Sequence, residues 1–274
     1  MQGFSQVPGI DYFDTYTPVA KLASIHTVLA LATHLDLELH QINIKGAYLN
    51  GKLNDDETIY MHQPPGYANP ALPHHVCCLR KTLYRLKQSS RHWYQKLVEI
   101  LVKNLRFKQC EVDQAVFIKQ SEKTLIIIVV HIDDCTIATS TPSLIIELKV
   151  QIRNHVEITD LGELHWLLGI KVTRKREEQT IALSQRLYLE SIICRFRFND
   201  LKPVLTPVEP HTKLTNTQFP LTGAEYTSMQ HIPYHEAIRS LMYTALSMHP
   251  NISYAVSTVL HFVSNPGMPH WAVC

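Results

Sequence analysis

The sequence predicts an α+β fold, a sheet with helices on one face, and two sets of observations support this. The chain opens with a helix–strand pair: apolar residues recur at helical spacing over 22–35, and 37–44 then alternates as a strand does. Farther on, 115–119 and 124–132 have strand character, and 133–140 turns back from the second of them as a hairpin. Helix–strand units followed by hairpins favour the α+β class.

The same two periodicities predict the remaining elements. They are a helix near 89–105 with Trp93, Leu97, Ile100, Leu101 and Leu105 inward, a helix over 143–154, a strand over 163–172, its partner over 180–185 and a helix from Arg186. Ser24 is expected to cap the first helix. The segment 54–75 is expected to be a loop because it holds four prolines and three consecutive acids.

The character of the chain changes near Asp200. A turn-rich segment begins there and leads into helical patterns over 234–247 and 252–263. We therefore expect one large domain over 1–200 and a mainly helical appendage over 201–274.

Composition excludes several classes of protein. The longest apolar run, 125–130, is far shorter than the roughly 20 residues needed to cross a bilayer. The N-terminus has no basic and apolar regions of a secretory signal, and the six cysteines show no paired metal or disulfide spacing. We expect an intracellular protein with reduced thiols. "HHVCC" (74–78) is either a metal site or, as we favour, a strand in which Val76 and Cys77 pack.

Basic residues are concentrated between Leu79 and Lys108. This stretch contains nine Lys or Arg and one acid, Glu99. Such a run is typical of a surface that follows a phosphate backbone, and equally of a solvated helix face.

Two acids, Asp133 and Asp134, lie at the tip of the predicted hairpin. Carboxylates at such a tip, beside the end of a neighbouring strand, can converge on Mg²⁺ ions as nucleotidyl transfer requires. Ordinary turn chemistry explains a paired Asp as well. Because successive strand side chains face opposite ways, the two acids are not expected to contribute equally.

Eight motifs, in order along almost the whole chain, decide between these readings. They are "QGFSQVPGIDYFDTYTPVAK", "QINIKGAYLNGKL", "IYMHQPPGY", "LRKTLYRLKQSSRHWY", "HIDD", "ITDLGELHWLLGIKV", "IALSQRLYLE" and "IPYHEAIRSLMYTAL". Together they resemble the reverse transcriptase region of copia-type retrotransposon polyproteins. The resemblance implies reverse-transcriptase-like fingers and a palm with a ferredoxin-like sheet over 1–200. A connection segment over 201–274 would lead to a ribonuclease H domain.

The resemblance also implies roles for particular residues. Asn43 falls where the family has its first metal-binding Asp, and Asp133 and Asp134 match the acidic pair, with Asp133 the more direct ligand. Tyr48 matches the aromatic residue under the sugar of the nucleotide, and Gln88 and Ala47 join it in the substrate-binding set. Nucleic-acid contacts are implied for Arg80, Lys81, Lys87, Arg91, Trp166 and Gly169.

The implied ligands are Mg²⁺ or Mn²⁺, an RNA or DNA template–primer and deoxynucleoside triphosphates. Other products of a retrotransposon polyprotein are possible partners, and no membrane is implied. The expected location is a cytoplasmic virus-like particle or the nucleus.

The sequence departs from the family pattern at several positions. Asn43 replaces an Asp, Gly46 a Thr, Arg85 a Gly, Ser90 a Pro and His131 an aromatic residue. Met1 also falls just after the basic strand that supplies fingertip contacts, and the chain stops before any ribonuclease H domain. We therefore expect a weak or inactive RNA-directed DNA polymerase. The alternatives are a catalytically dead relic that binds nucleic acid, and a plain interaction module.

Overall fold

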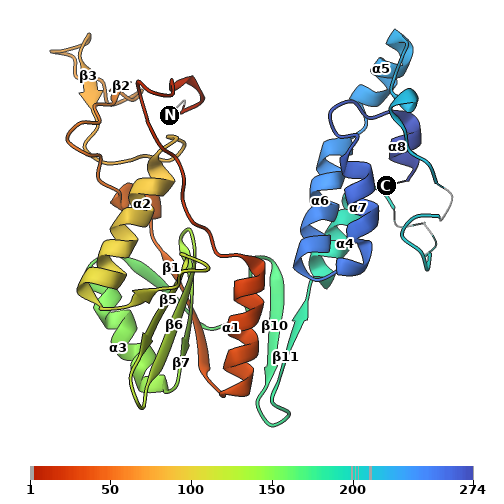
Figure 1. Ribbon diagram of the computed structural model, residues 1–274. Coiled ribbons are helices and arrows are strands. Elements are labelled where there is room, and N and C mark those ends of the chain that lie inside the picture. The colour runs from red at the N-terminus through yellow and green to blue at the C-terminus, as the bar shows by residue number, and fades with distance from the viewer. Residues whose placement is uncertain (1–2, 199, 201, 203, 210–211, 274) are drawn as a thin grey trace. The chain divides into compact units, whose positions relative to one another are not determined.

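The computed structural model describes residues 3–198, 200, 202, 204–209 and 212–273. The chain divides into two compact units (Figure 1). Unit 1 is Met1–Leu164 with Arg174–Ile181, and unit 2 is His165–Thr173 with Ala182–Cys274. The division therefore falls earlier in the chain than Asp200, and the assignment of 1–200 to fingers and palm stays a prediction.

Unit 1 is built on a six-stranded antiparallel sheet. The strand order is β4-β5-β6-β7-β1-β8. The strands are β1 (Glu38–Ile44), β4 (Lys108–Gln109), β5 (Val116–Gln120), β6 (Leu125–His131), β7 (Asp134–Thr139) and β8 (Ile158–Glu163). Strands β6 and β7 are consecutive in the chain and pair as the predicted hairpin. Strand β1, from much earlier in the chain, lies between β7 and β8.

Helices cover both faces of this sheet. They are α1 (Leu22–His34), α2 (Ser89–Val98), which continues as a π-helix (Glu99–Asn104), and α3 (Pro142–Arg153). Apolar residues of α2 and α3 form one core with the alternate residues of β1, β6 and β7. The five inward residues predicted for 89–105 are all buried. Figure 1 shows α1 on the opposite side of the sheet, so the prediction that the helices share one face is right only for α2 and α3.

The start of α1 differs from the prediction. Ser24 lies inside the helix and Lys21 occupies the N-cap position. The capping carboxylate comes from Asp113, whose Oδ2 accepts a hydrogen bond from the Lys21 backbone N–H at 2.9 Å. Burial alone would raise the pKa of Asp113, but hydrogen bonds from Ser24, Lys21 and Ala115 outweigh it and lower that pKa. Because Asp113 lies far from Lys21 in the sequence, no pattern near the start of α1 predicts this cap.

The predicted single strand over 163–172 is wrong. The segment instead contains β9 (Trp166–Leu167) and the start of β10 (Ile170–Lys175), which pair antiparallel. The turn between them consists of Leu168 and Gly169, with φ of 51° and 78°. Two successive left-handed residues are what a two-residue hairpin turn requires, and Gly169 adopts that conformation without strain. The partner of β10 is β11 (Thr180–Ser184), as predicted.

The predicted loop over 54–75 also contains a strand. This is β2 (Tyr60–His62), which pairs antiparallel with β3 (Val76–Cys78). Val76 is 48% exposed, so the expectation that it packs is wrong. A short strand of this kind is stabilised by a partner beyond the loop, and periodicity within three residues cannot reveal it.

Unit 2 is mainly helical. Its helices are α4 (Arg186–Arg195), α5 (Gly223–Gln230), α6 (Tyr234–Ser247), α7 (Ser253–Leu260) and α8 (Met268–Ala272). The predictions of α4, α6 and α7 are confirmed, whereas α5 and α8 were not predicted. Tyr234, Ile238 and Val259 form a small core between α6 and α7. In the part of the chain that the structure describes, no helix combines the length and the apolar character needed to span a membrane.

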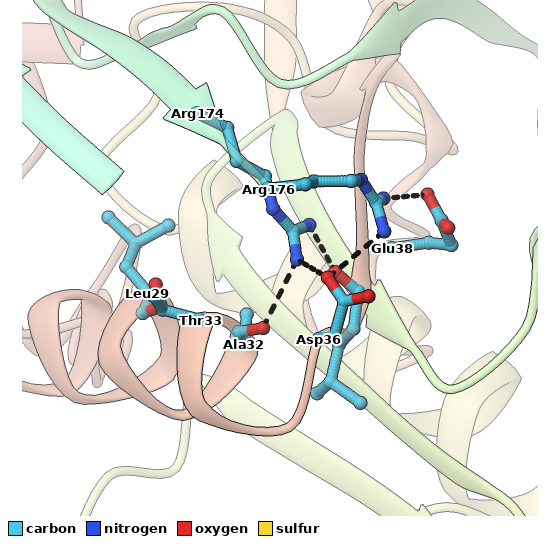
Figure 2. Close-up of polar contacts among 8 residues, drawn as sticks. Leu29, Ala32, Thr33, Asp36, Glu38, Arg174 and Arg176 are labelled. Carbon is cyan, nitrogen blue, oxygen red and sulfur yellow. Dashed lines mark hydrogen bonds and ion pairs between the residues drawn. The ribbon is translucent and has the colours of Figure 1, made fainter. Parts of the chain in front are cut away.

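Two arginines fix the tip of the β10–β11 hairpin to the end of α1 and the start of β1 (Figure 2). The Arg174 guanidinium donates to the carbonyls of Ala32 and Leu37, and to Asp36 Oδ1 at 2.6 Å. The Arg176 guanidinium donates to Asp36 Oδ1 at 3.1 Å and to Glu38 Oε2. Because a helix leaves its last carbonyls without intrahelical donors, a cation here stabilises the C-terminus of α1.

The two arginines should differ in their contribution to this contact. The side chain of Arg174 is 16% exposed and that of Arg176 is 42% exposed. We expect Arg174→Ala to destabilise the hairpin tip by about 2 kcal/mol, because it removes the donor to the Leu37 carbonyl and the charged hydrogen bond to Asp36. The solvent-screened pairs of Arg176 should contribute less than about 1 kcal/mol. Hydrogen-exchange mass spectrometry of 174–181 should therefore show a clearly larger acceleration for Arg174→Ala than for Arg176→Ala. Equal acceleration would contradict this ranking.

Candidate active site

The register of β1 against β7 brings Asn43 and Asp134 together. The two residues are directly paired across the strands. Asn43 Nδ2 donates to Asp134 Oδ1 at 3.1 Å. The strand-end residue and the hairpin acid therefore lie side by side, and their role as metal ligands stays a prediction.

The turn between β6 and β7 carries the other acid. His131 pairs with Asp134, so the turn consists of Ile132 and Asp133 alone. Ile132 has a φ of 61°, which is uncommon for a β-branched residue. Both turn carbonyls accept hydrogen bonds from outside the hairpin: Ile44 N–H donates to Asp133 O at 2.8 Å, and Trp93 Nε1–H to Ile132 O at 2.8 Å. Helical periodicity predicts that Trp93 is buried but gives no sign of this contact.

The two acids create a negative field at the end of the sheet. Burial raises the pKa of the Cys135 thiol to about 12, and Asp134 and Asp133 add to the shift. Burial likewise raises the pKa of Tyr48, with a further contribution from Asp133. Among the described residues, no basic side chain forms an ion pair with either acid, so this field is open to a cation from solution.

The substrate-binding candidates have different environments. Tyr48 is half-buried in the turn that follows β1, a 3₁₀ segment (Ala47–Asn50), with its ring 5.1 Å from that of Tyr84. Ala47 is 1% exposed and belongs to the core. Its burial leaves almost no surface for a ligand, so a direct contact between Ala47 and substrate stays a prediction.

Gln88 has no exposed surface, and the N-terminal segment occupies its amide. Gln88 Nε2 donates to the carbonyl of Asp11 at 2.9 Å, and Gln88 Oε1 accepts from Gln6 Nε2 at 3.0 Å. A role for Gln88 in binding nucleotide stays a prediction, and it requires the segment around Gln6 and Asp11 to move away.

The basic run is not one continuous stripe. Arg80, Lys81, Arg85 and Lys87 are exposed before α2, whereas Lys103, Arg106 and Lys108 are exposed at its far end. Between the two groups, Arg91 pairs with Asp14 at 2.5 Å and Lys96 pairs with Glu99 at 2.9 Å. The nucleic-acid candidates Arg80, Lys81 and Lys87 therefore form one exposed group, and Arg91 is already paired.

The remaining two nucleic-acid candidates lie in unit 2. Trp166 is 42% exposed and pairs with Lys171 across the β9–β10 hairpin. Gly169 is in the turn of that hairpin, where Tyr243 Oη donates to the neighbouring carbonyl of Leu168. The turn is thereby fixed to α6 of the same unit, and a role in gripping nucleic acid stays a prediction.

The donors at the end of the sheet suit a hard cation. Asp133 and Asp134 supply carboxylate oxygens, the ligands that Mg²⁺ and Mn²⁺ prefer. Asn43 directs its amide nitrogen at Asp134, and its oxygen becomes a ligand only if the amide turns over and this hydrogen bond is lost. Within the described residues, no three or more His, Cys, Asp or Glu gather as a metal site, and "HHVCC" is no exception.

Comparison with known proteins gives the family. The model of the family "Reverse transcriptase (RNA-dependent DNA polymerase)" matches residues 1–210. The chain belongs to the reverse transcriptase family. The resemblance predicted from the eight motifs is thus confirmed.

Several of its relatives come from transposons. The chain is 39% identical to the retrovirus-related Pol polyprotein from transposon TNT 1-94 of Nicotiana tabacum, over 99% of this chain and 20% of that protein. It is 35% identical to the Pol polyprotein from transposon RE1 of Arabidopsis thaliana, over 98% of this chain and 18% of that protein. A putative transposon Ty5-1 protein of Saccharomyces cerevisiae is 27% identical over 84% of this chain and 71% of its own length. The chain spans about a fifth of the plant polyproteins, and no solved structure matches it.

One departure from the reverse transcriptase pattern has a visible structural consequence. Arg85, where the family motif has Gly, adopts a φ of 75°. Gly3 packs so closely on this residue that a Cβ at position 3 would lie 1.7 Å from the Arg85 carbonyl oxygen. This backbone conformation is one that glycine adopts without strain and that other residues rarely adopt. A left-handed L-residue carries a strain of about 1–2 kcal/mol.

Replacement of Arg85 by Gly should therefore stabilise the protein. Relief of strain exceeds the extra chain entropy of glycine, so we expect a gain of about 0.5–1 kcal/mol, measured as a higher urea midpoint. The matched control is Lys87→Gly, which removes an exposed cation from the same loop at a position without positive φ. That control should be neutral or destabilising. If both variants shift the midpoint alike, the strain at Arg85 is not the cause.

Proposed function

We propose that this reverse transcriptase domain retains the nucleotidyl-transfer site of its family in an impaired form. Asp133 and Asp134 are the metal-binding acids, Asn43 is a degenerate third ligand, and polymerase activity is weak or absent. The sheet of unit 1 with α2 and α3 is the palm, with a ferredoxin-like arrangement. The ligands of the proposed site are a template–primer of RNA or DNA and deoxynucleoside triphosphates. The observation that carries the proposal is the contact between Asn43 and Asp134.

Each residue has a defined task in this mechanism. The acids would hold two divalent cations, which when bound would lower the pKa of the attacking 3′-hydroxyl and stabilise the leaving pyrophosphate. The side chains of Asp133 and Asp134 supply two negative charges, and the strand pairing fixes where the second of them lies. Tyr48 forms the wall beside the sugar. Asn43 supplies an oxygen at best, and no charge.

The missing charge is large enough to govern activity. A divalent cation and a unit charge 4 Å apart interact by roughly 8 kcal/mol at an effective dielectric of 20, an upper guide before solvent compensates. Loss of half of this from the transition state would slow the chemical step by roughly a thousandfold. The hydrogen bond from Asn43 to Asp134 adds to the loss, because a cation must displace the amide to reach that oxygen.

Primer extension on an RNA template with Mg²⁺ tests this account. We expect the native protein to extend poorly and Asn43→Asp to extend roughly a thousandfold faster. The control is Asn43→Asp combined with Asp133→Ala, which should abolish the gain. Efficient extension by the native protein would show that Asn43 is an adequate ligand and that the metal-site argument is wrong.

A second readout separates metal binding from turnover. Without metal, Asn43→Asp places a carboxylate beside Asp134, so repulsion should lower the unfolding temperature relative to the native protein. Added Mn²⁺ should then raise the unfolding temperature of Asn43→Asp more than that of the native protein, since binding to the folded state stabilises it. If Asn43→Asp binds Mn²⁺ but does not extend a primer, the proposed function fails, because restoring the third ligand does not restore synthesis.

A second candidate function is binding of nucleic acid without synthesis. The exposed group of Arg80, Lys81 and Lys87 favours it, because none of the three pairs with an acid among the described residues. These cations are free to neutralise phosphates and release counterions.

Salt dependence of binding provides the test. For a labelled RNA–DNA template–primer, combined replacement of Arg80, Lys81 and Lys87 by Ala should weaken binding and reduce the slope of log K against log salt by up to about 3. The matched control replaces Lys103, Arg106 and Lys108, which carry the same charge at the other end of α2. Equal losses in both variants would indicate a general charge effect and contradict a specific surface.

A further inference from the structure

We propose that Trp93 is a positioning residue for the acidic turn: its indole N–H holds the Ile132 carbonyl and thereby fixes Asp133 and Asp134 for metal binding. This inference rests on the proposed function, since it concerns the same acids. It assigns a task in the site to a side chain of α2 that contacts neither acid.

The contact is specific to tryptophan. Trp93 is 2% exposed and packs in the main core of unit 1. Its Nε1–H donates to Ile132 O at 2.8 Å. Tryptophan alone among the large apolar side chains combines a ring that fills such a core with a hydrogen-bond donor that cannot also accept. Phenylalanine would keep an aromatic ring in the core but leave this carbonyl without its donor.

The turn needs such support. It consists of two residues, and Ile132 takes a left-handed conformation that a β-branched side chain disfavours. Strained backbone of this kind persists only where its surroundings hold it. The Asp133 carbonyl is held by Ile44 of β1. Trp93 holds the preceding carbonyl from the helix side, so two successive peptide groups are fixed from two different elements.

The position of the turn determines the position of the acids. Asp133 is the second turn residue and Asp134 is the first residue of β7. If the Ile132 peptide rotates to relieve its strain, the backbone that carries the Asp133 carboxylate rotates with it. Displacements near 1 Å are enough to reduce catalysis about a hundredfold. Loss of one buried hydrogen bond on α2 can thus be transmitted to the ligand geometry without unfolding the sheet.

The experiment uses the Asn43→Asp protein, in which the proposed function predicts the strongest metal binding. Mn²⁺ affinity is measured by electron paramagnetic resonance titration without nucleic acid, and kcat and KM by primer extension. We expect Trp93→Phe to weaken Mn²⁺ binding about tenfold and lower kcat at least tenfold, with KM for the template–primer unchanged. Trp271→Phe, which alters an aromatic cluster of unit 2, is the matched control and should change neither.

A second variant separates the hydrogen bond from packing. Replacement of Trp93 by its benzothienyl analogue keeps the bicyclic ring and removes only the N–H. Losses equal to those of Trp93→Phe support the proposal, and retention of native Mn²⁺ affinity by the analogue overturns it. If Asn43→Asp binds Mn²⁺ without extending a primer, the proposed function fails while the Mn²⁺ titration still decides the role of Trp93.

Discussion

The antiparallel pairing of β1 with β7 is the constraint on which the site depends. It joins a strand near the start of the chain to one almost a hundred residues later, in the middle of the sheet. This register sets Asn43 opposite Asp134, and a slip by one residue would turn one of the two side chains to the opposite face. The alternating apolar residues of both strands enforce the register, because Ile42, Ile44 and Ile137 fill the same core. The chemistry of the site is therefore determined by packing well below it.

Much of this arrangement was predictable, and the errors have physical causes. The long periodic elements were found because burial of one face leaves a clear signal, as in α1, α2 and α6. The hairpin with its acids was found from an apolar run followed by a turn. By contrast, the cap from Asp113 and the contact from Trp93 join residues far apart in sequence, and no local pattern encodes them. The prediction of one strand over 163–172 is wrong because Leu168 and Gly169 form a turn, and the apolar residues around them continue the strand pattern across it.

For the candidate site, the resemblance predicted which residues to consider but not how accessible each one is. Resemblance located Asn43, Asp133 and Asp134, and the structure brings Asn43 and Asp134 into contact. Resemblance could not show that Gln88 is covered by the N-terminal segment, because that depends on hydrogen bonds particular to this chain. Nor could a count of basic residues show their division by α2 into two exposed groups. The solvent accessibility of a candidate residue depends on the tertiary contacts of this chain, and a motif does not encode those contacts.

The burial of Cys135 directly after the two acids has a consequence for redox chemistry. Oxidants attack the thiolate form of cysteine, and a pKa of about 12 keeps this thiol protonated throughout the cellular pH range. The Cys135 sulfur, in the same strand as Asp134, is therefore protected from oxidation to a sulfenic acid. Cys78 and Cys194 are exposed and would be oxidised first. Oxidative damage would thus reach the outer surface of this protein before it reached the acidic turn.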